Sequence, residues 1–180
     1  MTTSQIPRSR LVEWSDPTAI ADQAMRAPGL EFLQAIVDGT LPQPPMATLL
    51  RSRLVAVTRG SATFTCDVDE SMCNPIGSIH GGVVCTLLDS VLGCAVHTTL
   101  PVGHGYTSID TNVQFQRGLQ PTSGPLTAIG RVTKPGRRVA FAEGEVADAR
   151  GVVVARGYGT LLVIAPESEP GQGQPQIPGD

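Results

Sequence analysis

The chain has 180 residues, 41% of them apolar, which is enough for one domain with its own hydrophobic core. A net charge of -3 argues against a nucleic-acid partner, and no apolar run approaches the roughly 20 residues that cross a bilayer. The N-terminus lacks the apolar stretch of a secretory signal, so we expect a cytoplasmic protein with reduced thiols.

Residues 1–45 read as an N-terminal extension with short helices. Asp16 as N-cap and Pro17 at the first helical position predict a helix start. A second apolar face recurs at helical spacing over residues 30–37. The Pro-rich stretch 42–45 predicts an extended connector.

Residues 46–165 show the pattern of one α+β domain, and the Pro- and Gly-rich residues 166–180 that of a disordered tail. Residues 81–98 form one long helix whose apolar residues cover most of its circumference, so we expect burial on nearly all sides. A curved, mainly antiparallel sheet wrapped around that helix is the simplest fold, because no alternating βαβ units are seen. The predicted strands span 48–59, 61–70, 106–116, 124–133, 138–148 and 152–164.

Two of these strands have informative patterns. Residues 106–116 alternate between apolar and polar side chains from Ile109 to Phe115, which predicts a half-buried strand. Gly157 and Gly159 alternate on the last strand and leave room for close packing, which we expect to be that of the long helix.

Cysteine and histidine residues do not suggest a metal site. The four cysteines and three histidines lack ligand spacing, so we expect no metal and no cofactor. Cys85 and Cys94 fall inside the apolar helix, where a free thiol behaves as a small hydrophobic group.

The most informative segment runs from Asn74 to Asp89. A polar, Gly-rich turn with Asn74 and His80 leads directly into the long helix, and Gly81 and Gly82 leave the backbone N–H groups of the helix start approachable. A helix N-terminus is a ready site for a polarised oxygen, and a carboxylate within an apolar helix is costly unless it is used. These features predict a site that polarises a carbonyl group and attacks it.

This segment resembles the hotdog-fold acyl-CoA thioesterases, specifically the phenylacetate-pathway (PaaI-like) branch. The shared pattern is an Asn, a Gly-containing turn, His-Gly-Gly and an Asp nine residues after the His. The likeness extends over about residues 28–164. Here the pattern is met by Asn74, Gly77, His80, Gly81, Gly82 and Asp89.

The resemblance implies hydrolysis of an acyl- or aryl-CoA thioester to the free acid and coenzyme A, which enters as part of the substrate. The Gly81 N–H would polarise the thioester carbonyl, and Gly82 would keep the approach open. Asp89 would act as general base or nucleophile, with a pKa that burial should raise.

Helix geometry adds a constraint on assembly. Gly81 and Asp89 are eight residues apart, roughly 12 Å along a helix axis, so one thioester carbon cannot touch both. The resemblance implies a homodimer with shared sites, assembled further into a dimer of dimers. We therefore expect each site to use Gly81, His80 and Asn74 of one chain with Asp89 and Ser108 of the other.

Several of these residues have ordinary structural alternatives. Asn74 could simply bond to its own turn, and His80 could only cap the helix. Ser108 is placed by the resemblance where a hydroxyl could bond water or Asp89, but Thr107 could take that role instead.

A basic turn and two rival activities complete the predictions. Lys134, Arg137 and Arg138 cluster in a turn that the resemblance places near the phosphates of coenzyme A, although a solvated basic turn explains them equally well. A hotdog-fold enoyl-CoA hydratase or dehydratase and a non-catalytic acyl-CoA-binding protein remain alternatives. The sequence does not identify the acyl group.

Overall fold

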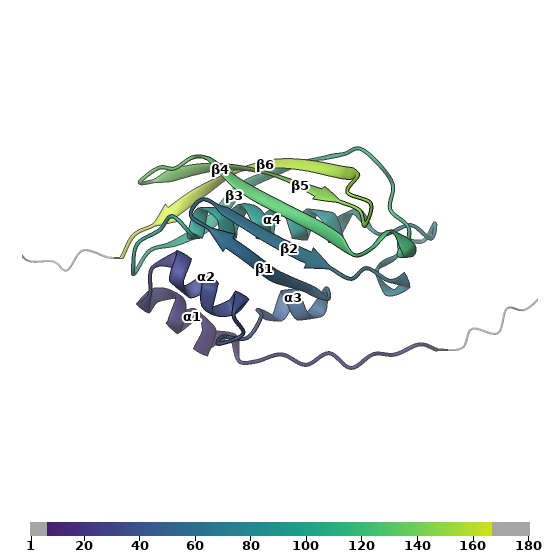
Figure 1. The fold of residues 1–180 in the computed structure, drawn as a ribbon, viewed down its shortest axis with the longest axis horizontal. Helices are drawn as coiled ribbons and strands as arrows, with labels where there is room; N and C mark the ends of the chain where they lie inside the picture. Colours follow the sequence, from purple (N-terminus) through teal and green to yellow (C-terminus); the bar gives the residue numbers. More distant parts are fainter. Residues whose placement is uncertain (1–6, 167–180) are drawn as a thin grey trace, which may run out of the picture.

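The computed structural model describes residues 7–166 and contains one six-stranded sheet with four helices (Figure 1). Two short 3-10 turns, Glu70–Met72 and Pro121–Ser123, lie in the connections. The helices are α1 (Pro17–Arg26), α2 (Gly29–Val37), α3 (Pro45–Leu49) and α4 (Gly81–His97). The strands are β1 (Ser52–Thr58), β2 (Ser61–Cys66), β3 (Gly105–Phe115), β4 (Leu126–Lys134), β5 (Val139–Ala147) and β6 (Val153–Ile164).

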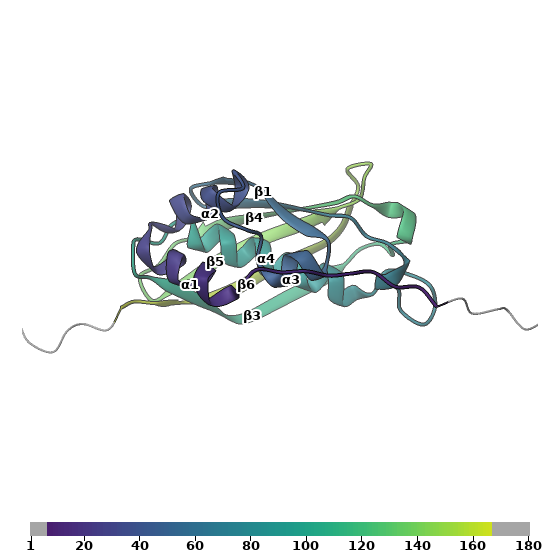
Figure 2. The same ribbon diagram turned by 90° about the horizontal axis from the view of Figure 1, so that it is seen from below.

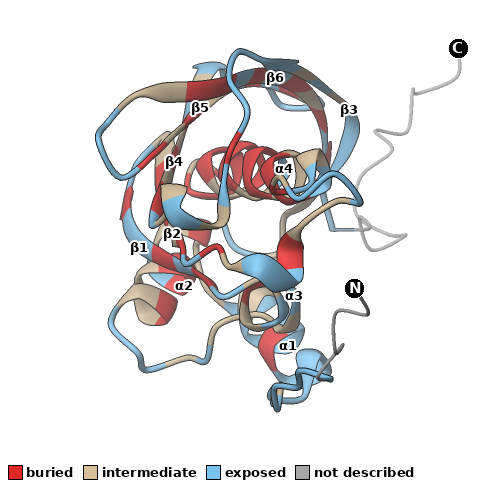
Figure 3. Cartoon of the chain, turned by 90° about the vertical axis from the view of Figure 1, so that its right-hand side faces the viewer, coloured by how far each residue is buried: buried red, intermediate tan, exposed pale blue. Residues whose placement is uncertain are grey.

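The sheet curves over α4, as the sequence predicted. Its strand order is β1-β2-β4-β5-β6-β3, and every neighbouring pair is antiparallel. Seen along α4, the strands form an arch above the helix, while α1, α2 and α3 lie below it (Figure 3). This arrangement is α+β and confirms the predicted fold class.

A row of glycines lets α4 approach the sheet closely. Gly130, Gly144 and Gly157 are direct cross-strand neighbours on β4, β5 and β6. A Cβ atom on Gly130 would collide with the carbonyl oxygen of Val91, and one on Gly157 would lie 3.1 Å from Leu88 Cδ1. The predicted close packing of the helix on the last strand is confirmed, and it extends to two more strands.

Most of α4 is buried, as predicted, but one stripe of the helix stays open in the single chain. The side facing the sheet is fully covered, with Leu88 and Val91 at 0% exposure. The opposite side keeps an open stripe, in which Gly82 and Asp89 are exposed and Cys85 is half-buried. The arch therefore covers one side of the helix only, because β3 ends the sheet before it closes.

Strand β3 also differs from its predicted half-buried state. None of its residues is buried, and Ile109 and Phe115 are 57% and 54% exposed. A bulge between Ser108 and Asp110 breaks the regular alternation. As the edge strand of the sheet, β3 presents backbone groups that no other described strand pairs with.

The other edge strand, β1, is protected. The Gln43 side chain accepts a hydrogen bond of 3.0 Å from the Leu54 N–H and donates one of 3.3 Å to the Leu54 carbonyl. The amide thus occupies the place of a neighbouring strand, and α2 and α3 pack beside β1. One edge of the sheet is therefore blocked within the chain and the other is not.

The N-terminal elements partly match the predictions. Asp16 caps α1 as expected, with Oδ1 accepting from the Thr18 N–H at 2.9 Å. Residues 42–45 were predicted as an extended connector, but Pro45 instead begins α3, where its missing N–H costs nothing. Helix α3 and the 3-10 turn Glu70–Met72 also shorten the first two predicted strands.

The segment before α1 runs along the helical layer (Figure 2). Arg10 in this segment donates a hydrogen bond of 2.6 Å from Nη2 to the Leu49 carbonyl. Within residues 7–166, even α4 is too short to span a bilayer. The predicted disordered tail falls almost entirely on residues 167–180, which lie outside the described residues.

Candidate functional site

His80 caps the start of α4. As N-cap residue, His80 accepts a hydrogen bond of 2.8 Å at Nδ1 from the Gly82 N–H. The ring must therefore be protonated at Nε2 when neutral, and this atom remains available to a ligand. The hydrogen bonds formed within residues 7–166 leave the Gly81 N–H without an acceptor, at the positive end of the helix dipole.

Asn74 shapes the loop ahead of the helix. Its Oδ1 accepts from the N–H groups of Ile76 at 3.1 Å and Ser78 at 3.2 Å, which is the local bonding foreseen for a turn residue. Gly77 completes the turn with φ at +85°, in the left-handed region. Since only the oxygen forms hydrogen bonds within residues 7–166, the Asn74 amide N–H₂ group can donate to a ligand.

Asn74 and Gly81 line a shallow hollow of about 380 Å³. The Phe115 ring forms one wall, and its Cζ would lie 3.0 Å from a Cβ atom on Gly81. Arg117, which the sequence reasoning missed, is exposed at the rim, two residues after the end of β3. The polar and aromatic lining comes from Asn74, Ser78, Gly81, Phe115, Gln116 and Arg117.

Asp89 forms a second polar group, two turns further along α4. Its Oδ1 accepts hydrogen bonds from Ser108 Oγ at 2.7 Å and Thr111 Oγ1 at 3.3 Å, and its Oδ2 accepts none within residues 7–166. The side chain is exposed, so the expected burial of Asp89 was wrong for the single chain. The carboxylate is thus fixed at one oxygen and accessible at the other.

The β3 bulge explains which hydroxyls reach Asp89. In a regular strand Ser108 and Asp110 would share a face, but the extra residue at Ile109 shifts the phase so that Thr111 joins Ser108. The structure therefore selects Ser108 rather than Thr107 as the partner of Asp89. Thr111 was missed, because no sequence signal marks the bulge.

Within one chain the two groups do not form a single site. Gly81, His80 and Asn74 lie at the helix start, and the hollow there does not include Asp89 or Ser108. This separation agrees with the length of α4 between them.

The basic turn lies at the other end of α4. The Gly60 N–H donates to Thr98 Oγ1 at 2.7 Å, and the Val132 N–H donates to the Gly60 carbonyl at 2.8 Å. These bonds place the β4–β5 turn beside the helix C-terminus, away from Gly81. Lys134, Arg137 and Arg138 are exposed there, and none forms an ion pair within residues 7–166.

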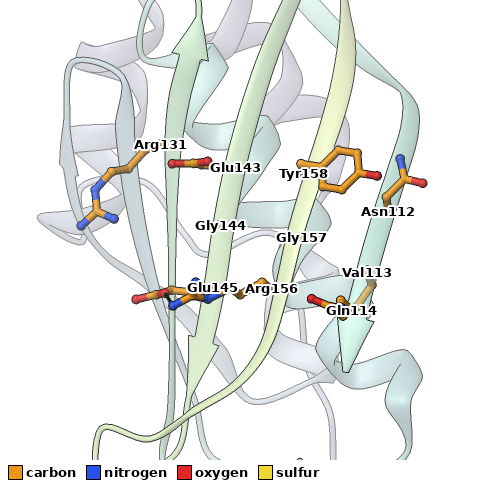
Figure 4. Close-up of a pocket in the computed structure, with 10 residues that line it drawn as sticks. All are labelled: Asn112, Val113, Gln114, Arg131, Glu143, Gly144, Glu145, Arg156, Gly157 and Tyr158. Atoms are coloured by element: carbon orange, nitrogen blue, oxygen red, sulfur yellow. Dashed lines mark ion pairs between the residues drawn. The ribbon is translucent and has the colours of Figure 1, made fainter. Parts of the chain in front are cut away.

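A larger hollow, of about 590 Å³, lies on the outer face of the sheet (Figure 4). Its side chains come from β3, β4, β5 and β6, and Arg156 forms an ion pair of 3.4 Å with Glu145. None of the predicted site residues lines it. Across residues 7–166, no group of His, Cys, Asp and Glu side chains could hold a metal ion.

The sequence around this site matches known proteins. Residues 76–155 match the family model of the thioesterase superfamily. A putative esterase of Halobacterium salinarum is 37% identical over 96 residues, covering 49% of this chain and 62% of that protein. Human acyl-coenzyme A thioesterase 13 is 28% identical over 108 residues, covering 59% of this chain and 76% of that protein.

A solved structure supports the same relationship. A putative thioesterase of Ralstonia eutropha, described as related to phenylacetic acid degradation, has 28% sequence identity and a TM-score of 0.66. The similarity covers 72% of this chain and 98% of that one. The match to the Halobacterium esterase spans less than two thirds of its length, but the fold, the motif and the family model agree. Residues 76–155 are therefore similar to the thioesterase superfamily, and the chain has the hotdog fold of the Ralstonia phenylacetic-acid-degradation-related protein.

Proposed function

We propose that this protein is an acyl-CoA thioesterase, which hydrolyses an acyl- or aryl-CoA thioester to a free acid and coenzyme A. The observation that carries the proposal is the Asp89 carboxylate, which Ser108 holds at 2.7 Å through one oxygen while the other stays accessible. The name of the human relative, an acyl-coenzyme A thioesterase, supports the choice of substrate class.

Asp89 attacks through its accessible Oδ2. As general base, it takes a proton from a water molecule whose oxygen bonds to the thioester carbon; as nucleophile, it bonds to that carbon itself. In either case the carbonyl oxygen gains negative charge and the C–S bond then breaks, so that coenzyme A leaves as the thiolate. On the base route the thiolate takes up the proton held by Asp89; on the nucleophile route a water molecule then hydrolyses the acyl–Asp89 anhydride and releases the free acid. Ser108 and Thr111 keep the carboxylate in place while it reacts.

Gly81 stabilises the charge on the carbonyl oxygen. Its unpaired N–H and the positive end of α4 suit an oxyanion. The Asn74 amide group is a further donor at the same hollow, and His80 Nε2 is one beside the helix start; they position the carbonyl or the attacking water. Gly82 keeps the approach free of side chains.

The two half-sites come from different chains of a homodimer. The open stripe of α4 and the unpaired edge of β3 lie on one side of the molecule, so a two-fold axis there covers both. Antiparallel α4 helices then bring Gly81 of one chain towards Asp89 of the other. The same arrangement brings Lys134, Arg137 and Arg138 towards that site, where they bind the phosphates of coenzyme A.

A pair of variants tests this function and its shared site. Gly81→Pro removes the N–H at a helix position that tolerates proline, and His80 already has an extended backbone, with ψ at 134°, that suits a following proline. Gly81→Ala is the matched control, because it also places a Cβ atom against Phe115 but keeps the N–H. Release of free thiol from a panel of aryl, short-chain and medium-chain acyl-CoA esters is the measurement.

Mixing the variants distinguishes a shared site from a site within one chain. Gly81→Pro and Asp89→Asn should each be nearly inactive alone. After unfolding and refolding together, a shared site should restore about a quarter of the wild-type rate, since half of the random dimers are mixed and each has one intact site. No recovery would contradict the shared site, and no thiol release by the wild-type protein from any ester would contradict the function.

A further inference from the structure

Tyr106 closes the space on one side of Asp89. Gly93 follows Asp89 by one helical turn, on the same face of α4. A Cβ atom on Gly93 would lie 2.5 Å from the Tyr106 ring and hydroxyl, so the absence of a side chain at this position lets the ring lie directly on the helix. Gly93 is buried as a result. The open stripe of α4 therefore ends immediately after Asp89.

The Tyr106 ring packs against further aromatic side chains. The ring centroids of Tyr106 and His97 are 5.5 Å apart, and those of His97 and Phe32 are 5.6 Å apart. His97 and Phe32 are both buried, and α2 is held to the end of α4 by a hydrogen bond of 3.0 Å from the Gly29 N–H to the Leu100 carbonyl. Tyr106 is thus the front of a packed wall built from α2, α4 and β3.

The other side of Asp89 is open. Towards the helix start, Gly82 is exposed, and Cys85 and Thr86 are half-buried. Within one chain, a thioester at Asp89 therefore meets the wall on one side, and on the other side it meets only the helix start that the partner chain supplies in the proposed dimer. Coenzyme A is much too large for the closed side, so only the acyl group can point towards Tyr106.

We propose that Tyr106 ends the acyl-binding space and restricts the enzyme to short acyl groups. The inference rests on the proposed thioesterase function and adds the residue that sets its chain-length preference. Ser108 supports this placement, since it lies two residues from Tyr106 on β3 and bonds to Asp89 at 2.7 Å. The acyl group is therefore held between the reacting carboxylate and the ring.

The test compares variants of Tyr106 on a series of straight-chain acyl-CoA esters from acetyl to dodecanoyl. The wild-type kcat/KM should fall steeply once the chain reaches the ring. Tyr106→Leu and Tyr106→Ala should raise kcat/KM for longer esters relative to acetyl-CoA by about 10- to 100-fold, the scale of discrimination for one or two methylene groups in a closed pocket. Tyr106→Phe should keep the wild-type profile, because the ring and not the hydroxyl fills the space.

Tyr158→Ala is the control for loss of a tyrosine, since Tyr158 is 65% exposed on the outer face of the sheet. If the smaller variants do not fold, Tyr106→Trp should still narrow the preference further than Tyr106→Phe. A chain-length profile that is the same for every residue at position 106 would overturn this inference while leaving the thioesterase function intact. Absence of thiol release by the wild-type protein would instead overturn the proposed function, and this inference with it.

Discussion

Ser108 Oγ donates a hydrogen bond of 2.7 Å to Asp89 Oδ1 and so joins the edge strand β3 to the open side of α4. The bond uses only one carboxylate oxygen, and Thr111 bonds to the same one. A carboxylate serving only to link the two elements would have no need of an accessible second oxygen. The arrangement instead suits a group that must be fixed in place and still react.

Replacing Asp89 by asparagine should abolish most of the thioesterase activity. The amide cannot accept a proton or attack a thioester, so kcat/KM should fall by about 10²- to 10⁴-fold. Asp110→Asn is the matched control, because Asp110 is an exposed carboxylate on β3 that bonds only to Asn112 within residues 7–166. Circular dichroism and gel filtration should show unchanged fold and assembly. Wild-type turnover by Asp89→Asn would exclude Asp89 as the reacting group.

The hydroxyl groups around Asp89 should contribute unequally. Ser108→Ala removes the shorter hydrogen bond, to a charged acceptor, and should lower kcat/KM about 10-fold. Thr111→Val removes the 3.3 Å bond and should have a smaller effect. Thr107→Ala should leave the rate unchanged, because Thr107 does not bond to Asp89. A larger loss at Thr107 than at Ser108 would show that the β3 bulge does not set the register of the site.

The amino-acid sequence was sufficient for the fold and for the position of the helix start. The Asp16 cap, the apolar pattern of α4 and the small residues of β6 are local signals, and each specifies one outcome. The exposure of Asp89 is not local. It depends on how far the sheet reaches around α4. The apolar pattern that includes Val83 and Leu88 would be the same whether the side of the helix that carries Asp89 is covered or open.

The same limit applies to the details of the site. Thr111 reaches Asp89 only because one residue is added to β3, and a bulge depends on the pairing with β6 rather than on the composition of either strand. Pro45 fits both an extended connector and the first position of a helix. The sequence therefore could not decide between a connector and the α3 helix. The family resemblance supplied the choice of Ser108, which composition and periodicity alone did not.

The row of glycines that packs against α4 predicts a stability effect. Gly130→Ala would force a Cβ atom against the Val91 carbonyl, so the helix or the strand must shift, and the free energy of unfolding should fall by about 1–3 kcal/mol. Gly105→Ala is the matched control, because nothing lies within 4 Å of a Cβ atom there and the change should be within about 0.5 kcal/mol. Urea unfolding at equal protein concentration measures both. Equal stability of the two variants would contradict the close contact between α4 and β4.

His97 predicts a pH dependence of stability. Burial lowers the pKa of His97 below its ordinary value of 6.5, so the folded protein resists protonation of this ring. As pH falls through 6.5, the unfolded chain binds a proton that the folded chain does not, and the free energy of unfolding should decrease until the pH reaches the folded pKa. The residues packed on the ring, Tyr106 and Phe32, offer no charge to offset this effect, because burial raises the pKa of Tyr106 well above its usual range.

A variant separates His97 from the other titrating groups. His97→Gln cannot take up a proton, so its unfolding free energy should decline less than that of the wild type between about pH 7 and pH 5. His104→Gln replaces a ring outside the core, whose Nδ1 lies 3.1 Å from the Val102 carbonyl, and serves as the control for the loss of a histidine. Urea unfolding at a series of pH values gives the comparison. Parallel pH profiles for wild type and His97→Gln would contradict this prediction, because the imidazole would then be protonated as readily in the folded protein as in the unfolded chain. The packing of α2 against the end of α4 would in that case be looser than the hydrogen bond at Gly29 indicates.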